Sequence, residues 1–142
     1  MIFVTNSHPS LRFPKRETIR TLECVLKLEA AKDAELSVVF VGSRFIRRVN
    51  KKFLDHDYTT DVIAFPLGEG AGSRLEGELY INLDRARSQA ETYGVTAAEE
   101  TRRLLIHGTL HLLGYTDATP RKKAMMSRRE DEILARLSNT RR

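Results

Sequence analysis

Cysteine and long apolar runs are what this sequence of 142 residues most lacks, and each lack excludes a class of protein. Because Cys24 is the only cysteine, no disulfide can form within the chain, which fits a reducing compartment. No apolar run approaches the roughly 20 residues that a membrane-spanning helix needs. The first residues also lack the basic segment followed by an apolar segment that marks a secretory signal. We therefore expect a cytoplasmic protein without membrane contact.

Repeats, low-complexity tracts and linker-like stretches are also absent. The length is that of one ordinary domain, which buries about two-thirds of its unfolded surface. Apolar periodicity and turn residues predict four strands and five helices: strands at residues 2–5, 36–41, 60–65 and 78–82, and helices at residues 15–29, 43–53 and 84–93, after Thr96, and from Pro120. We expect a single α+β domain over residues 1–142, in which about five helices pack on a small mixed four-stranded sheet.

Acidic residues are fewer than basic ones: the sequence has 19 Asp and Glu and 24 Lys and Arg, which gives a net charge of +5. This balance favours a polyanionic partner such as nucleic acid. The basic residues gather on two predicted helices, the first with Arg44, Arg47, Arg48, Lys51 and Lys52 and the second with Arg121, Lys122, Lys123, Arg128 and Arg129. Two interpretations are open for each cluster, the solvated face of a helix, which is the usual role of a charge run, or a contact with RNA.

Two of the four histidines, His107 and His111, lie four residues apart in the predicted helix after Thr96. This spacing places both imidazoles on one helix face, one turn apart, where they can bind a single ion. Gly114 follows at a position where a helix can end in the left-handed conformation, which lets the chain turn back and bring Asp117 beside the pair. We predict a metal centre of His107, His111 and Asp117 on the penultimate helix.

A pair of histidines at this spacing can also be structural, packed in the core or capping a helix end. The glycine that follows and the oxygen ligand three residues after it favour the metal. Three protein ligands leave one position open to water or substrate, which is typical of catalytic rather than structural zinc.

A glutamate next to the first histidine is missing, and this argues against a metallopeptidase. In the His-Glu-x-x-His pattern that glutamate acts as general base on the metal-bound water. Here Gly108 stands in its place. A peptidase-like hydrolase is therefore a less favoured alternative, since its base would have to come from elsewhere in the fold.

Several short motifs follow one another along the chain in a distinctive order. They are Asn50 with Phe53 and Asp57, the run Thr60-Asp61-Val62 with Phe65, the segment Gly77-Glu78-Leu79-Tyr80-Ile81-Asn82-Leu83-Asp84, and the run His-Gly-x-Leu-His-Leu-x-Gly-Tyr that begins at His107. This order, which spans most of the chain, resembles the bacterial YbeY family of endoribonucleases that mature ribosomal RNA.

The resemblance implies a single-domain α+β protein with one zinc ion per chain. It implies a single-strand-specific endoribonuclease that acts in late 16S rRNA 3′-end maturation and in ribosome quality control. The implied partners are ribosomal RNA or the 30S subunit, with ribosomal proteins or a GTPase as further partners, all in the cytoplasm.

Two positions depart from the usual pattern of the family. Asp117 stands where a third histidine ligand is common; aspartate binds zinc well, but its harder, anionic oxygen also suits other divalent metals such as manganese. Leu54 stands where the family usually has an arginine that is thought to serve RNA cleavage, and leucine cannot bind a phosphate. His56 is then a weak candidate for an acid, base or phosphate-contact role, the alternative being an ordinary loop histidine.

Leu54 also keeps a function of another class open, a non-catalytic ribosome-associated factor whose metal is structural. Asp61 and Asp84 belong to the quoted motifs, and for both we favour a structural role as a helix or loop cap over direct catalysis.

Overall fold

The computed structural model describes residues 1–31, 33–55, 59–68 and 74–140. Its elements are, in chain order, β1 (Ile2–Asn6), α1 (Lys15–Leu28), β2 (Ala34–Val41), α2 (Ser43–Leu54), β3 (Val62–Pro66), β4 (Leu75–Asn82), α3 (Leu83–Tyr93), α4 (Ala97–Leu112) and α5 (Pro120–Thr140). Five helices and one four-stranded sheet over the described residues confirm the predicted α+β architecture. Within those residues no helix has both the length and the apolar character needed to cross a membrane.

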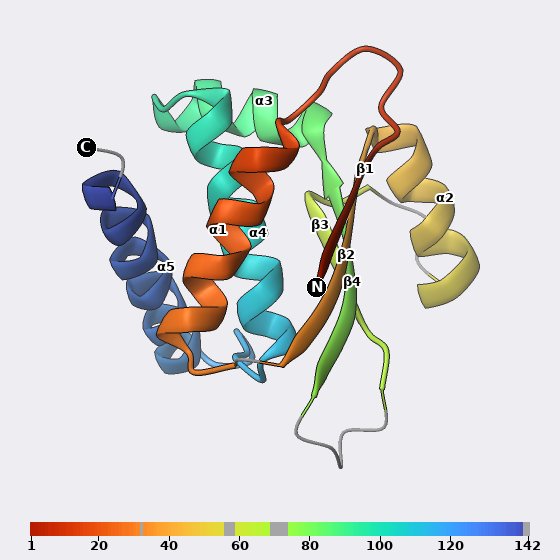
Figure 1. Ribbon diagram of the computed structural model, residues 1–142. Coiled ribbons are helices and arrows are strands. Elements are labelled where there is room, and N and C mark those ends of the chain that lie inside the picture. The colour runs from red at the N-terminus through yellow and green to blue at the C-terminus, as the bar shows by residue number, and fades with distance from the viewer. Residues whose placement is uncertain (32, 56–58, 69–73, 141–142) are drawn as a thin grey trace.

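The sheet has the order β1-β2-β4-β3 and is mixed. β1, β2 and β4 run parallel to their neighbours, and β3 pairs antiparallel with β4 at one edge. Figure 1 shows α1, α4 and α5 on one side of the sheet and α2 alone on the other. The edge strand β3 therefore lies between α2 and the helices of the opposite layer.

Strand alternation supplies a core on both faces of the sheet. Leu36, Val38 and Phe40 of β2 are fully buried and belong to the larger apolar cluster, which lies under α1 and α4. On the opposite face Ile46 and Val49 of α2 pack in a smaller cluster with Val41 of β2 and Ile63 of β3. Residues alternate between the two clusters because successive side chains of a strand point to opposite faces.

β4 begins at Leu75, earlier than the predicted start at residue 78. The added residues include Glu76 and Gly77, which have low intrinsic strand propensity. They are extended because they pair in register with Glu35 and Leu36 of β2. β3, in contrast, begins later than predicted, at Val62 instead of residue 60.

α4 lies very close to the sheet at Gly108. A Cβ atom at this position would be 2.8 Å from Leu79 Cδ2 and 3.1 Å from Val62 Cγ2, so only a residue without a side chain fits without displacing them. The helix is capped at its start, where Thr96 Oγ1 accepts a hydrogen bond from the Glu99 N–H at 3.0 Å. The cap fixes where α4 begins, and Gly108 allows the helix to lie close to β3 and β4.

We expect Gly108→Val to destabilise the protein. The added side chain would enter space occupied by Leu79, which is fully buried, and overpacking of this kind typically costs about 1–3 kcal/mol. Urea unfolding followed by circular dichroism measures the loss. Ala98→Val is the control, because this position is exposed on the same helix and the substitution should lower the free energy of unfolding by only about 0.5 kcal/mol. Equal stability of Gly108→Val and the unmodified protein would contradict the close packing.

Candidate metal centre

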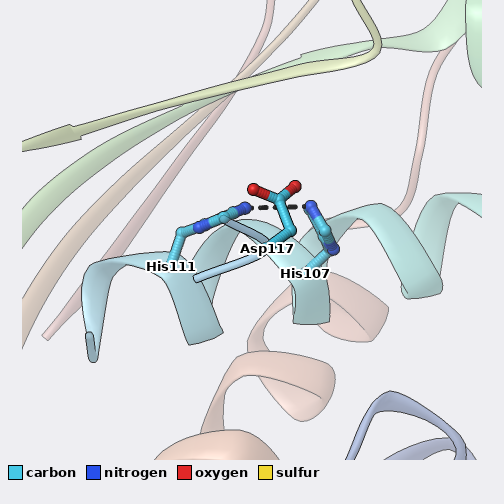
Figure 2. A group of neighbouring side chains, drawn as sticks. All are labelled: His107, His111 and Asp117. Carbon is cyan, nitrogen blue, oxygen red and sulfur yellow. Dashed lines mark hydrogen bonds between the residues drawn. The ribbon is translucent and has the colours of Figure 1, made fainter. Parts of the chain in front are cut away.

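His107 and His111 lie near the end of α4, and Asp117 lies in the segment that joins α4 to α5 (Figure 2). The chain turns between them at Gly114, whose φ of +104° is a conformation that favours glycine. One ligand atom from each of the three side chains lies within 4.8 Å of the other two. The structure therefore brings the three predicted ligands together as a group that could hold a metal ion.

The two imidazoles are oriented by acceptors on their outer nitrogens. His107 Nδ1 donates to Glu130 Oε2 at 2.5 Å, and His111 Nδ1 donates to the Tyr115 carbonyl at 3.1 Å. Because a carboxylate and a carbonyl only accept, we assign the proton of each neutral ring to Nδ1. Both Nε2 atoms then carry free lone pairs, which is the tautomer that binds metals.

These two Nε2 atoms are only 3.1 Å apart, along the dashed line of Figure 2. Two lone pairs at that distance repel each other unless a proton on one ring, which gives a hydrogen bond, or a metal ion lies between them. Zinc–nitrogen bonds of about 2.0–2.1 Å at a tetrahedral angle would separate the two nitrogens by roughly 3.3 Å, close to the observed spacing. The residues present therefore fit a divalent metal ion.

Glu130 is the one residue of this site that sequence reasoning missed. Its side chain is 7% exposed and also contacts Arg103 Nη1 at 3.3 Å. A signal for it exists in the sequence, since Met126, Glu130, Ile133 and Leu137 recur at helical spacing on one face of α5, and the other three are buried apolar residues. A carboxylate within such an apolar stripe needs a partner, and the partner here is His107.

The electrostatics of the site favour positive charge. Burial by itself would lower the pKa of His107, but the hydrogen bond and charge of Glu130, followed by the charges of Asp61 and Asp117, outweigh burial and raise the pKa above its ordinary value. Asp61, which precedes β3, is thus close enough to act on His107. Its own carboxylate accepts a hydrogen bond from Gln89 Nε2 at 3.2 Å.

Asp84 has the structural role that we expected for it. Its carboxylate accepts hydrogen bonds from the Ser43 N–H at 2.9 Å and from His8 Nε2 at 2.8 Å, so that it caps the first turn of α2. Burial tends to raise the pKa of Asp84, but these two hydrogen bonds and the charge of His8 outweigh it and lower the pKa. His56, the weak catalytic candidate, lies outside the described residues.

We expect Glu130→Gln to weaken divalent-metal binding by about 10- to 100-fold, the usual effect of losing the acceptor behind a histidine ligand. Glutamine keeps the shape but removes the negative charge that orients and polarises His107. Competition with a chromogenic zinc chelator measures the affinity. Glu132→Gln, exposed on the same helix, is the matched control and should bind as the unmodified protein does. Equal affinities for the two variants would contradict the role assigned to Glu130.

Comparison with known proteins agrees with this geometry. The model of the endoribonuclease YbeY family matches residues 4–138. The endoribonuclease YbeY of Chlorobaculum parvum is 43% identical over 116 residues, which are 82% of this chain and 81% of that protein. The one of Cytophaga hutchinsonii is 37% identical over 135 residues, 94% of each chain.

A solved structure has the same fold. The solution structure of TM1509 from Thermotoga maritima superposes with a TM-score of 0.71 at 25% identity and covers 99% of this chain and 91% of that one. The resemblance inferred from the motifs is confirmed by the family model and by these relatives. The chain belongs to the YbeY family of endoribonucleases.

Proposed function

We propose that the chain is a single-strand-specific, metal-dependent endoribonuclease of late 16S rRNA 3′-end maturation and ribosome quality control. The observation that carries the proposal is the pair of imidazole Nε2 atoms 3.1 Å apart, each ring oriented through its Nδ1, with a carboxylate beside them. Membership of a family of endoribonucleases supports RNA as the substrate. Ribosomal RNA of the 30S subunit is the proposed partner, with ribosomal proteins or a GTPase as further partners in the cytoplasm.

His107, His111 and Asp117 would hold one ion, with zinc as the proposed metal. A bound divalent ion supplies Lewis-acid chemistry at a phosphate oxygen or lowers the pKa of a water molecule. Three protein ligands leave a position for substrate or water. Because aspartate binds through a hard, anionic oxygen, the site is also better suited to divalent metals other than zinc than a site of three histidines would be.

The protein's own residues determine how the site meets its substrate. Glu130 and the Tyr115 carbonyl keep both imidazoles aimed at one point, so that no reorientation is needed when RNA binds. Asp117 is exposed and the two histidines are half-buried, which leaves the site open to a strand lying across the surface. A single strand can be laid there with its bases splayed, whereas a duplex holds its bases stacked and paired.

We expect the purified protein to cleave a single-stranded RNA that resembles the 3′ end of 16S rRNA, and His111→Ala to lose cleavage by at least about 100-fold. The reason is that alanine removes one of three ligands and leaves the ion loosely held. Gel analysis of labelled RNA, with added zinc and with a chelator, measures the rates.

Contaminating ribonucleases are the main source of error in this assay, so both proteins are purified in parallel. Cleavage that needs both His111 and the metal supports the proposal. Equal rates with His111→Ala, or cleavage that persists in chelator, would show that the metal centre is not the nuclease site.

A non-catalytic ribosome-associated factor is the second candidate, favoured by one observation. Leu54 is the last residue of α2, 41% exposed, and offers no charge at the position where the family usually has an arginine. In that function the metal would be structural, and its removal would unfold the protein.

We expect chelation to abolish cleavage while the circular dichroism spectrum and the RNA affinity stay unchanged, since the core clusters of the described residues form without the metal ligands. Thermal unfolding with and without chelator, beside RNA binding under the same conditions, makes the measurement. Loss of the folded spectrum on chelation would favour the structural metal instead.

A further inference from the structure

The exposed face of α2 is strongly basic. The 12 residues of this helix include five cations and no acidic residue. All five cations are exposed: Arg44, Arg47, Arg48, Lys51 and Lys52. Four of them, all but Arg47, make no ion pair with any other residue that the structure describes. These four cations of α2 therefore present positive charge that no acidic side chain among the described residues pairs with.

Aromatic rings are interleaved with these cations. Phe53 is 63% exposed with Lys52 Nζ 5.3 Å from its ring centroid, and Arg48 Cζ lies 5.7 Å from the centroid of Phe45. The two rings are the ends of a row in which neighbouring centroids are 5.9–6.3 Å apart, in the order Phe53, Phe65, Tyr80, Phe45. The inner rings belong to β3 and β4, so the row is held by the sheet.

The second basic cluster has acidic neighbours and, among the described residues, no cation lying over an aromatic ring. Arg129 of α5 is bound by Glu29 at 2.6 Å, by Glu132 at 2.9 Å and by the Leu28 carbonyl. The same helix carries a run of three acidic residues directly after Arg129. Arg129 is thus used in holding α5 against α1, while the other four cations of the cluster are exposed beside these acidic residues. Cations and aromatic rings without an acidic residue occur together on α2, which makes α2 the better surface for a polyanion.

α2 and the metal helix meet the two faces of the same edge strand. Val62 of β3 faces Gly108, which follows the ligand His107, while the next residue, Ile63, packs with Ile46 and Val49 of α2. A strand of nucleic acid that crosses the β3 edge can therefore contact both the metal centre and the surface of α2.

We propose that the surface formed by α2 and the row of rings binds the single-stranded RNA beside the scissile phosphate. Phosphates pair with Arg48, Lys52 and their neighbours, and bases stack on the exposed rings of Phe53 and Phe45. Positive charge along a backbone track with aromatic rings for stacking is the general chemistry of single-strand binding. This inference rests on the proposed function, because it takes single-stranded RNA as the substrate.

The test compares two pairs of substitutions that remove the same charge. Arg48→Gln with Lys52→Gln changes the α2 surface, and Lys15→Gln with Arg16→Gln removes one arginine and one lysine from the exposed start of α1. Both pairs are made in His111→Ala protein, so that RNA stays intact. Fluorescence anisotropy with a labelled single-stranded RNA of about 12 nucleotides gives Kd over a range of salt concentrations.

We expect the α2 pair to weaken binding and to reduce the slope of log affinity against log salt by about 1.4, since each lost phosphate contact on a single strand contributes about 0.7. The α1 pair should leave the slope unchanged. Phe53→Ala should weaken binding at least about five-fold with an unchanged slope, because stacking does not release counterions. Melting temperatures confirm that all variants are folded.

The outcomes separate this inference from the proposed function. Equal affinity and slope for the two pairs would overturn the α2 surface, and cleavage by the unmodified protein would still support the nuclease. A selective loss with the α2 pair, together with no cleavage by the unmodified protein, would support the surface and reject the nuclease. Loss of ribosome binding without loss of RNA binding in the α2 pair would reject the inference in favour of a protein partner.

Discussion

The close approach of α4 to the sheet is the constraint on which the metal centre depends. Gly108 permits it, because any side chain there would meet Leu79 and Val62. The same contact explains why the site is not that of a metallopeptidase. A glutamate next to His107 would need space that the β4 core fills, so a helix packed this closely excludes the general base of the peptidase pattern. Packing and chemistry are thus decided by the same residue.

α5 acts on the site as well as on the core. Its buried apolar residues pack against α4 and α1, and within the same stripe Glu130 reaches His107. A buried carboxylate is costly unless it is paired. Here the cost is offset by Arg103 on one oxygen and by the imidazole on the other. The docking of α5 therefore sets the orientation of a ligand that lies 23 residues away in the sequence.

The edge strand β3 separates two kinds of surface. On the side of α4 lies a cluster of carboxylates and imidazoles that attracts a cation, and the charges of Asp61, Asp117 and Glu130 all act on His107. On the side of α2 lie exposed rings and five cations, four of which form no ion pair with a described residue. Opposite charges on the two sides of one strand suit a substrate whose backbone is anionic and whose reacting phosphate must meet a metal.

Local features could be predicted from the sequence because their causes are local. The spacing of His107 and His111 follows from the helix period, the turn at Gly114 from a conformation that glycine favours, and the cap at Thr96 from unpaired amides at a helix start. Strand alternation and apolar periodicity were sufficient for five helices and a four-stranded sheet. The family resemblance rested on the order of such local motifs.

The remaining features depended on which elements pack together, and this only the tertiary structure decided. The early start of β4 follows from pairing with β2, which overrides the low strand propensity of Glu76 and Gly77. The partnership of Glu130 with His107 required α5 to dock on α4. The two basic clusters have the same charge pattern in the sequence, and they differ because the sheet places the rings of Phe65 and Tyr80 beside α2, whereas α1 places Glu29 against Arg129. Sequence determined the ligands and the elements that carry them, and packing between distant segments determined their surroundings.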